Sequence, residues 1–253
     1  MIATDLALAL DPAALATRAG IVPDPWQADL LRTDARQVIM LASRQSGKST
    51  VSAALATHQA AYVPGSLVLV LSPSLRQSQE LYRKIRDTYG ALSGDVTKPA
   101  EESALRLELA NGSRIVSLPG KESTIRGFSG AALLLVDEAS RVPDALYQAV
   151  RPMLAVSGGR IVLLSTPFGK RGFFFREWTE GGDDWHRAKV TAYDCPRIPR
   201  AWLDRERERI GEWWFQQEYL CQFFESDDTV FGHDDVEAAL DDEAAPFVMG
   251  KVF

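Results

Sequence analysis

The segment Ser43–Ser49 (SRQSGKS) brings a glycine, a lysine and a hydroxyl together at the end of an apolar run. With Ala42 in front, it matches the phosphate-loop pattern GxxxxGK[ST] at every fixed position except the first glycine. In such a loop, backbone N–H groups surround the β- and γ-phosphates, the lysine compensates their charge, and the serine hydroxyl is a ligand for Mg²⁺. The residues expected to contact a nucleotide are Ser43, Arg44, Gln45, Ser46, Gly47, Lys48, Ser49 and Thr50. A strand-to-helix turn whose glycine serves only the backbone is the alternative.

Two acidic residues, Asp137 and Glu138, directly follow the apolar run Leu133–Val136. Open α/β sheets bind ligands at the carboxyl ends of their strands. Asp137 can orient the Mg²⁺ shell, and Glu138 can position or deprotonate the water that attacks a γ-phosphate. Paired acids also cap helices, which is the competing interpretation. Because each motif lies where the other requires it, together they favour an ATP and Mg²⁺ site with Lys48 and Glu138 as catalytic residues.

Three further residues fit such a site. Gln27, behind Pro25-Trp26, can read the adenine edge through its amide, although a lone glutamine is more often a surface residue. Ser165 and Thr166 end the next apolar run, so their hydroxyls are expected to face the γ-phosphate and to sense whether it is present. A plain strand-ending turn is the alternative for this pair.

Apolar runs and helical patterns alternate along the chain and predict the elements that position these motifs. The predicted strands cover residues 37–42, 67–71, 132–136 and 161–164, and a weaker strand signal lies around residues 186–192. The predicted helices cover residues 5–19, 49–62, 75–89 and 145–154. Asn111-Gly112 predicts a hairpin between residues 105–109 and 114–118. The alternation predicts an α/β fold of the P-loop NTPase (RecA/ASCE-like) type, a parallel sheet flanked by helices with a small C-terminal lid subdomain.

Composition and charge divide the chain into three parts. Residues 1–167 form the predicted P-loop ATPase core, and residues 168–224, rich in aromatic residues and arginine, form the predicted lid subdomain. Residues 225–253 carry nine acidic residues and one basic residue, a balance of −8. The whole chain has a net charge of −6, so subtracting the −8 of this tail leaves the rest at +2. The acidity therefore belongs to the tail and does not argue against a nucleic-acid partner of the body.

Several classes of protein are disfavoured by the composition. No apolar run approaches the roughly 20 residues that cross a bilayer, and the start lacks the basic segment of a signal peptide. Two cysteines and three isolated histidines, among 253 residues, predict neither a disulfide framework nor a zinc site. These features are typical of a cytoplasmic protein.

In order along the chain, the motifs resemble the ATPase domain of the large terminase subunit, the DNA-packaging motor of tailed bacteriophages and related prophages. The matching segments are Pro25-Trp26-Gln27, Ser43–Ser49, Ser72-Pro73-Ser74, Ile125-Arg126-Gly127, Leu135–Ala139, Ser165–Gly169 and Phe215–Phe223. The resemblance implies an ATPase that drives double-stranded DNA into a procapsid. It also implies a portal protein and a small terminase subunit as partners. The expected assembly is a homo-oligomeric ring, a pentamer, on the procapsid and a monomer in solution. The expected location is the bacterial host cytoplasm, with transient residence at the portal.

The resemblance also implies that Ser165-Thr166-Pro167 is the motif that couples hydrolysis to lid movement, and it assigns roles to two arginines. Arg126 matches the arginine proposed to reach the ATP of a neighbouring subunit, and Arg44 is the alternative finger within the same subunit. A guanidinium can stabilise charge on the transferring phosphoryl group, although Arg126 could instead pair with an acid on its own surface. The family normally continues into a nuclease, whereas the carboxylates of residues 225–253 have the spacing of a linker. A chain without DNA cleavage is therefore expected.

Two other functions stay open at this point. A superfamily-2-like helicase shares the glutamine and the Asp-Glu pair, but it needs a second RecA-like domain, for which the sequence leaves no room. A nucleotide-gated assembly module with little activity alone is compatible with a finger supplied by a partner.

Overall fold

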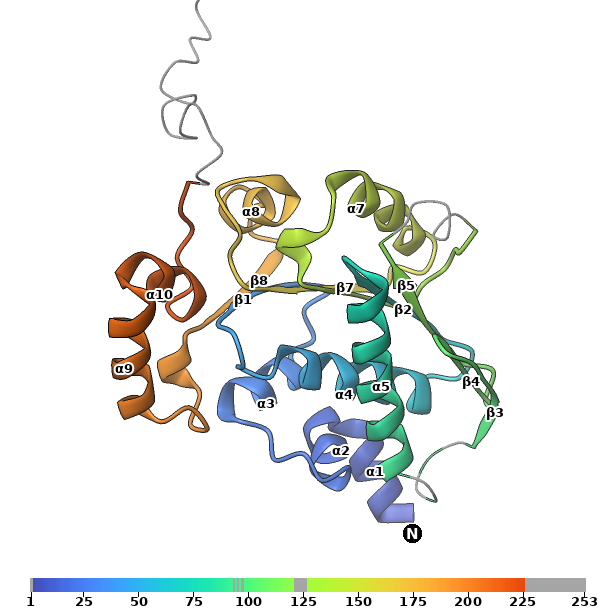
Figure 1. Ribbon diagram of the computed structural model, residues 1–253. Helices are drawn as coiled ribbons and strands as arrows, with labels where there is room; N and C mark the ends of the chain where they lie inside the picture. The colour runs from blue at the N-terminus through green and yellow to red at the C-terminus, as the bar shows by residue number, and fades with distance from the viewer. Residues whose placement is uncertain (1, 93, 95, 97, 121–126, 226–253) are drawn as a thin grey trace, which may run out of the picture.

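The computed structural model describes residues 2–92, 94, 96, 98–120 and 127–225, and Figure 1 shows a three-layer α/β arrangement. The central layer is an eight-stranded sheet in the order β3-β4-β5-β2-β6-β7-β1-β8. From one edge to the other, its strands are β3 (Pro99–Glu102), β4 (Arg106–Leu109), β5 (Arg114–Pro119), β2 (Leu67–Ser72), β6 (Leu133–Asp137), β7 (Arg160–Ser165), β1 (Gln37–Ala42) and β8 (Trp185–Val190). The pairs from β5 to β8 are parallel, and β3–β4 and β4–β5 are antiparallel.

The central strands are apolar on both faces because helices cover both faces of the sheet. Every residue of β2 and β6 is buried. In β1, Val38 and Met40 belong to one core cluster and Ile39 and Leu41 to the other, as the two-residue period of a strand requires. The first face is covered by α2 (Pro12–Arg18), α3 (Pro25–Arg32), α4 (Lys48–Tyr62) and α5 (Leu75–Ala91), with α1 (Ile2–Leu10) outside them (Figure 1). The second face is covered by α7 (Asp144–Val150) and α8 (Gly172–Thr179).

The C-terminal helices α9 (Arg200–Ile210) and α10 (Glu212–Glu218) form a smaller cluster beside the β8 edge (Figure 1). Leu203 and Phe215 are fully buried between them. Short 3₁₀ helices connect the larger elements: η1 (Ala139–Arg141), η2 (Arg151–Leu154) and η3 (Ala192–Asp194). No helix in the described part of the chain is long and apolar enough to cross a membrane.

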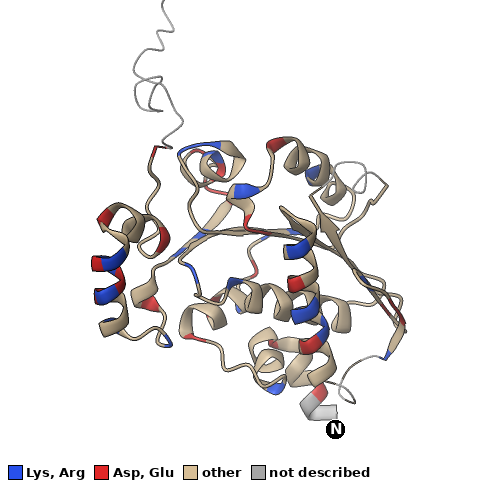
Figure 2. Ribbon diagram, in the orientation of Figure 1, with Lys and Arg blue, Asp and Glu red and all other residues tan. Residues whose placement is uncertain are grey.

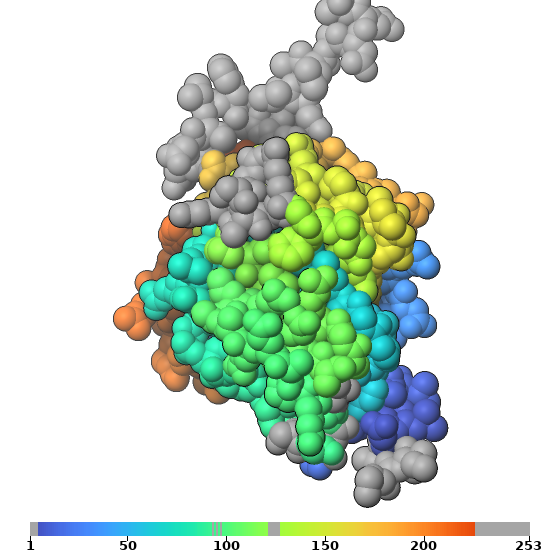
Figure 3. All heavy atoms as spheres, turned by 90° about the vertical axis from the view of Figure 1, so that its right-hand side faces the viewer, coloured from blue at the N-terminus to red at the C-terminus, as the bar shows by residue number. Residues whose placement is uncertain are grey.

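The opposite edge of the sheet is the hairpin region of β3, β4 and β5, whose residues cover the centre of the face in Figure 3. Edge strand β3 exposes Glu101 and Glu102 and begins at Pro99. Charges and proline on an edge strand discourage pairing with another chain.

Most predicted elements are confirmed, and four differ. The helix expected over residues 145–154 is α-helical only to Val150 and continues as the 3₁₀ helix η2. The helix expected over residues 5–19 is wrong, because the chain forms two helices separated at Asp11, whose carboxylate accepts a hydrogen bond from the Ala13 N–H as an N-cap. Proline at Pro12 suits the first position of the second helix. Strand β3 was not predicted. The weak strand signal after residue 185 corresponds to β8, which pairs with β1 inside the main sheet. The boundaries at residues 167 and 224 stay predictions.

Replacing Gly159 with alanine is expected to lower the free energy of unfolding by about 1–3 kcal/mol, the usual cost of overpacking. A Cβ at this position would lie 2.0 Å from the backbone oxygen of Ala131. Gly90 is the matched control: it lies in the last turn of α5, and an added Cβ meets no atom within 4 Å. Gly90→Ala should raise stability by about 0.5–1 kcal/mol through helix propensity. Urea denaturation measures both, and equal stabilities of the two variants would contradict the close packing at Gly159.

Candidate functional site

The predicted motifs meet because three neighbouring parallel strands end together. Strand β7 lies between β6 and β1, with Asp137 opposite Leu164 and Leu41 opposite Ser165. The loops that follow these strands therefore start side by side at the carboxyl edge of the sheet, where ligands of open α/β sheets bind.

A cavity of about 740 Å³ opens at this edge, within the size range of ligand sites. Eight of the predicted site residues line it: Arg44, Gln45, Gly47, Lys48, Ser49, Thr50, Glu138 and Thr166. Five others are buried in or behind its wall: Gln27, Ser43, Ser46, Asp137 and Ser165. Six lining residues were not predicted: Ile21, Val22, Gln77, Lys84, Arg141 and Arg197.

The loop between β1 and α4 has the backbone shape of a phosphate cradle. Gly47 has φ of 100°, in the left-handed region, and Gln45 has φ of 59°. A Cβ on residue 47 would lie 2.5 Å from Nε2 of Gln27. Glycine is thus required at this position by both its conformation and the close approach of Gln27.

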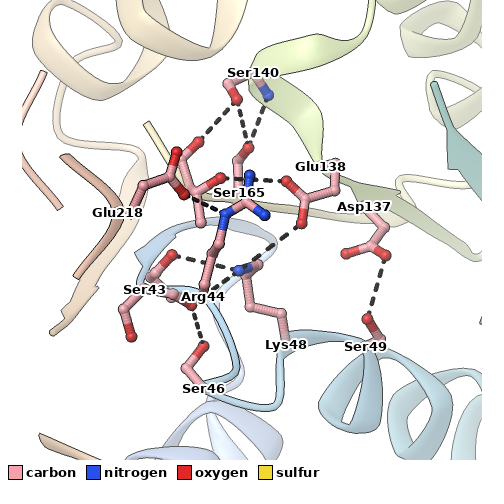
Figure 4. A network of polar contacts seen from close by, with 12 residues as sticks. Ser43, Arg44, Ser46, Lys48, Ser49, Asp137, Glu138, Ser140, Ser165 and Glu218 are labelled. Carbon is pink, nitrogen blue, oxygen red and sulfur yellow. Dashed lines mark hydrogen bonds and ion pairs between the residues drawn. The ribbon is translucent and has the colours of Figure 1, made fainter. Parts of the chain in front are cut away.

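Lys48 lies over the loop it belongs to (Figure 4). Its Nζ donates to the carbonyl oxygens of Ser43 at 3.0 Å and Ala42 at 3.4 Å, and it lies 3.9 Å from Oε1 of Glu138. The Ser46 hydroxyl donates to the same Ser43 oxygen at 2.8 Å. The ammonium therefore holds the loop and is already close to the acid expected to act on water.

Ser49 and Asp137, the two predicted magnesium ligands, lie next to each other. The Ser49 hydroxyl is 3.4 Å from Oδ2 of Asp137, whereas oxygens bound at about 2.1 Å to one octahedral Mg²⁺ lie about 3 Å apart. The second carboxylate oxygen, Oδ1, is buried and has no hydrogen-bond partner among the described residues. Burial, followed by the neighbouring charge of Glu138, raises the pKa of Asp137 to about 6. A divalent cation would satisfy this carboxylate, so the residues fit the ion.

Glu138 is held in an uncommon backbone conformation, with φ of 50° and ψ of 45°. Such strain in a residue other than glycine is concentrated at functional sites. Its side chain is partly exposed to the cavity, and its Oε2 accepts from the Thr166 hydroxyl at 3.4 Å. The carboxylate thus lies between Lys48 and Thr166, with access to a water molecule.

The two hydroxyls of the predicted coupling pair have different surroundings. Thr166 lines the cavity, whereas Ser165 is fully buried and bonded to Ser140. The Ser140 N–H donates to the Ser165 hydroxyl at 3.0 Å, and the Ser140 hydroxyl donates to the Thr166 carbonyl at 2.8 Å (Figure 4). The segment after Glu138 and the segment after β7 are therefore joined. Ser140 was not predicted, although it follows the acidic pair by two residues.

The two predicted arginines stand differently. Arg44 lines the cavity, but its side chain makes an ion pair with Glu218 at the end of α10, and its N–H donates to the Glu218 carbonyl at 3.0 Å (Figure 4). Arg126 lies outside the described residues. Its role as a finger stays a prediction.

Gln27 takes part in the wall of the site and does not line the cavity. It is 2% exposed, its Oε1 accepts from the Asp24 N–H at 2.8 Å, and its Nε2 lies 3.5 Å from the Ser46 carbonyl oxygen. The structure gives its amide a role in supporting α3 and the phosphate loop. Its reading of adenine stays a prediction.

Comparison with known proteins gives one consistent family. The model of the family described as "Terminase large subunit, T4likevirus-type, N-terminal" matches residues 39–238. The large terminase subunits of Thermus phage G20c and Thermus virus P23-45 are each 27% identical to this chain. Each alignment covers 84% of this chain and 51% of the relative. The chain thus spans about half the length of the curated relatives it matches.

Solved structures have the same fold. The large terminase ATPase domain of Thermus phage P74-26 superposes with a TM-score of 0.73 at 22% identity, covering 82% of this chain and 96% of that one. The HK97 bacteriophage large terminase gives a TM-score of 0.66 at 13% identity, covering 79% and 50%. The predicted α/β fold with a largely parallel sheet is confirmed. Since the family description covers most of the chain, the chain belongs to the terminase large subunit family, T4likevirus-type, N-terminal.

Proposed function

We propose that this chain is an ATP-hydrolysing motor domain of a large terminase subunit, driving double-stranded DNA into a viral procapsid. The observation that carries the proposal is that Lys48, Ser49 and Glu138 line one cavity at the carboxyl edge of the sheet, with Asp137 next to Ser49. Family membership and the solved relatives, among them the large terminase of a thermophilic bacteriophage in complex with ADP, support it.

The residues divide the chemistry between them. The N–H groups at the start of α4 and the Lys48 ammonium bind the phosphates, and Ser49 with Asp137 would hold Mg²⁺, which neutralises phosphate charge when bound. Glu138 accepts a proton from the attacking water, and the Lys48 ammonium lies 3.9 Å from its Oε1. The Thr166 hydroxyl donates to the same carboxylate, and the Thr166 carbonyl accepts from the Ser140 hydroxyl. A change at Glu138 therefore reaches the segment around Ser140 through Thr166.

Family membership also supports the proposed partners, which are double-stranded DNA, the portal protein and the small terminase subunit. On the same basis we propose assembly into a homo-oligomeric ring and location in the bacterial cytoplasm. Surface charge is compatible with weak binding of DNA by this part alone. Figure 2 shows acidic and basic residues alternating along α9, so that helix presents no uninterrupted basic surface. A ring would align several such subunits around one duplex.

The proposal is tested by the concentration dependence of ATP hydrolysis. If Arg126 acts on a neighbouring subunit, the rate per molecule should rise as assembly increases, because a finger supplied by a partner contributes about 10³–10⁵ in turnover. Arg126→Ala should remove this rise and leave ATP affinity nearly unchanged, since the finger stabilises the transition state. Phosphate release over a range of protein concentrations measures both effects.

Mixing Arg126→Ala with Glu138→Ala makes the test sharper. Each subunit then has the group that the other lacks, and a mixed interface should regain activity. If the mixture stays inactive and the wild-type rate per molecule is independent of concentration, the finger belongs to the same subunit. Arg44 would then be the candidate, because its side chain borders the same cavity.

A further inference from the structure

Arg197 reaches the phosphate loop from a distant part of the chain. It lies in the segment between η3 and α9, 151 residues after Ser46, and its Nη2 donates to the Ser46 carbonyl at 2.7 Å. The same nitrogen lies 2.9 Å from Oδ2 of Asp24, whose side chain is 9% exposed. A buried carboxylate needs a cation, so Arg197 neutralises Asp24 and ties the start of α3 to the phosphate loop.

The lining of the cavity combines polar and aliphatic side chains. Lys48, Ser49 and Glu138 suit phosphates, whereas the aliphatic side chains among its described lining residues are Ile21 and Val22. Arg197 lines the same cavity, and its ion-pair partner Asp24 follows Val22 by two residues. The base of a nucleotide has flat apolar faces, which suit aliphatic carbon and a planar cation.

The guanidinium of Arg197 is free to contact a base, whereas the amide of Gln27, the residue predicted to read the base, is not. Gln27 is buried with its amide oxygen already bonded to Asp24. The Arg197 side chain is 48% exposed, and its hydrogen bonds to other described residues use only Nη2. Its planar face, Nε and Nη1 therefore remain for a ligand.

We propose that Arg197 is a further nucleotide-binding residue whose guanidinium packs on the face of the base, opposite Ile21 and Val22. The inference rests on the proposed function, because it takes the phosphates to lie at Lys48. It predicts that Arg197 determines affinity for nucleotides that carry a base and hardly affects affinity for a bare phosphate chain. A bound nucleotide would then connect α3 with the segment leading to α9.

Calorimetric titration with ADP and with tripolyphosphate, which has no base, separates binding of the base from support of the loop. Arg197→Ala should weaken ADP on the order of 2- to 30-fold, the range of a cation–π contact. Tripolyphosphate affinity should stay within about 2-fold. Arg197→Lys keeps a charge for Asp24 without the planar face, and should also weaken ADP while preserving thermal stability. Arg200→Ala, on the exposed start of α9, is the matched control and should match the wild type with both ligands.

Two results would overturn the inference. Equal loss of ADP and tripolyphosphate affinity in Arg197→Ala would show that the side chain only supports Ser46 and Asp24. Unchanged ADP affinity in both Arg197 variants would place the base elsewhere while leaving the proposed ATPase intact. A wild-type protein that binds neither ligand would remove the proposed function, and this inference with it, so the two failures are distinguishable.

Discussion

Glu138→Gln is expected to reduce ATP turnover on the order of 10²–10⁴-fold, the usual contribution of a positioned general base. The amide keeps the size of the carboxylate but cannot accept the proton of the attacking water. Affinity for ATP should change little, because the phosphate loop and Lys48 remain in place. Measuring the steady-state rate and the ATP dissociation constant on the same preparation checks both statements.

Glu101→Gln is the matched control for this change, since Glu101 is exposed on the edge strand β3, far along the sheet order from β6. It should have the wild-type rate. Normal turnover in Glu138→Gln would assign the base to another residue. A parallel loss of ATP affinity would mean that Glu138 acts in binding and not in the reaction.

Lys48→Ala is expected to weaken ATP binding by roughly 30-fold or more, and to abolish turnover, because removing one partner of a buried charge contact costs about 2–5 kcal/mol. The contrast with Glu138→Gln is the diagnostic point, since one variant loses affinity and the other keeps it. Equilibrium titration with ATP measures the difference.

Loss of the Lys48 ammonium also releases the carbonyl oxygens of Ala42 and Ser43, so thermal denaturation must accompany the titration. Lys189→Ala, exposed on β8, controls for the loss of one positive charge. A folded Lys48→Ala protein with wild-type affinity for ATP would contradict the assignment of Lys48 as a phosphate-binding residue.

The sequence predicted the central elements of the site because they depend on local patterns. The strand 37–42 and the helix that follows it are encoded by an apolar run, a glycine in the left-handed region and a helix start within a dozen residues. The acidic pair after 133–136 is encoded in the same way. A short apolar run is predicted to be a buried strand from its own residues. The prediction is the same whichever strands are its neighbours in the sheet.

The contacts of Gln27, Ser165, Arg44 and Arg197 could not be predicted in this way. Apart from the bond between Gln27 and Asp24, each depends on a partner 19 or more residues away, such as Ser46 for Gln27 and Glu218 for Arg44. Nothing in the spacing of these residues records which hydroxyl faces the cavity and which bonds to Ser140. Strand β8 was weakly predicted for a different reason: it is an edge strand in which only the end residues Trp185 and Val190 are buried, which leaves little apolar signal.

The pairing of β1 has a consequence for synthesis of the protein on the ribosome. Strand β1 emerges early, yet both of its sheet neighbours, β7 and β8, come from residues 160–165 and 185–190. Until those residues leave the exit tunnel, an apolar strand has two unpaired edges, a state that favours association between nascent chains. The phosphate loop completes its contacts later still, because the hydrogen bond from the backbone N–H of Arg44 to the carbonyl of Glu218 needs almost all of the described chain. Chaperone demand should therefore be highest between the emergence of β1 and the emergence of β8.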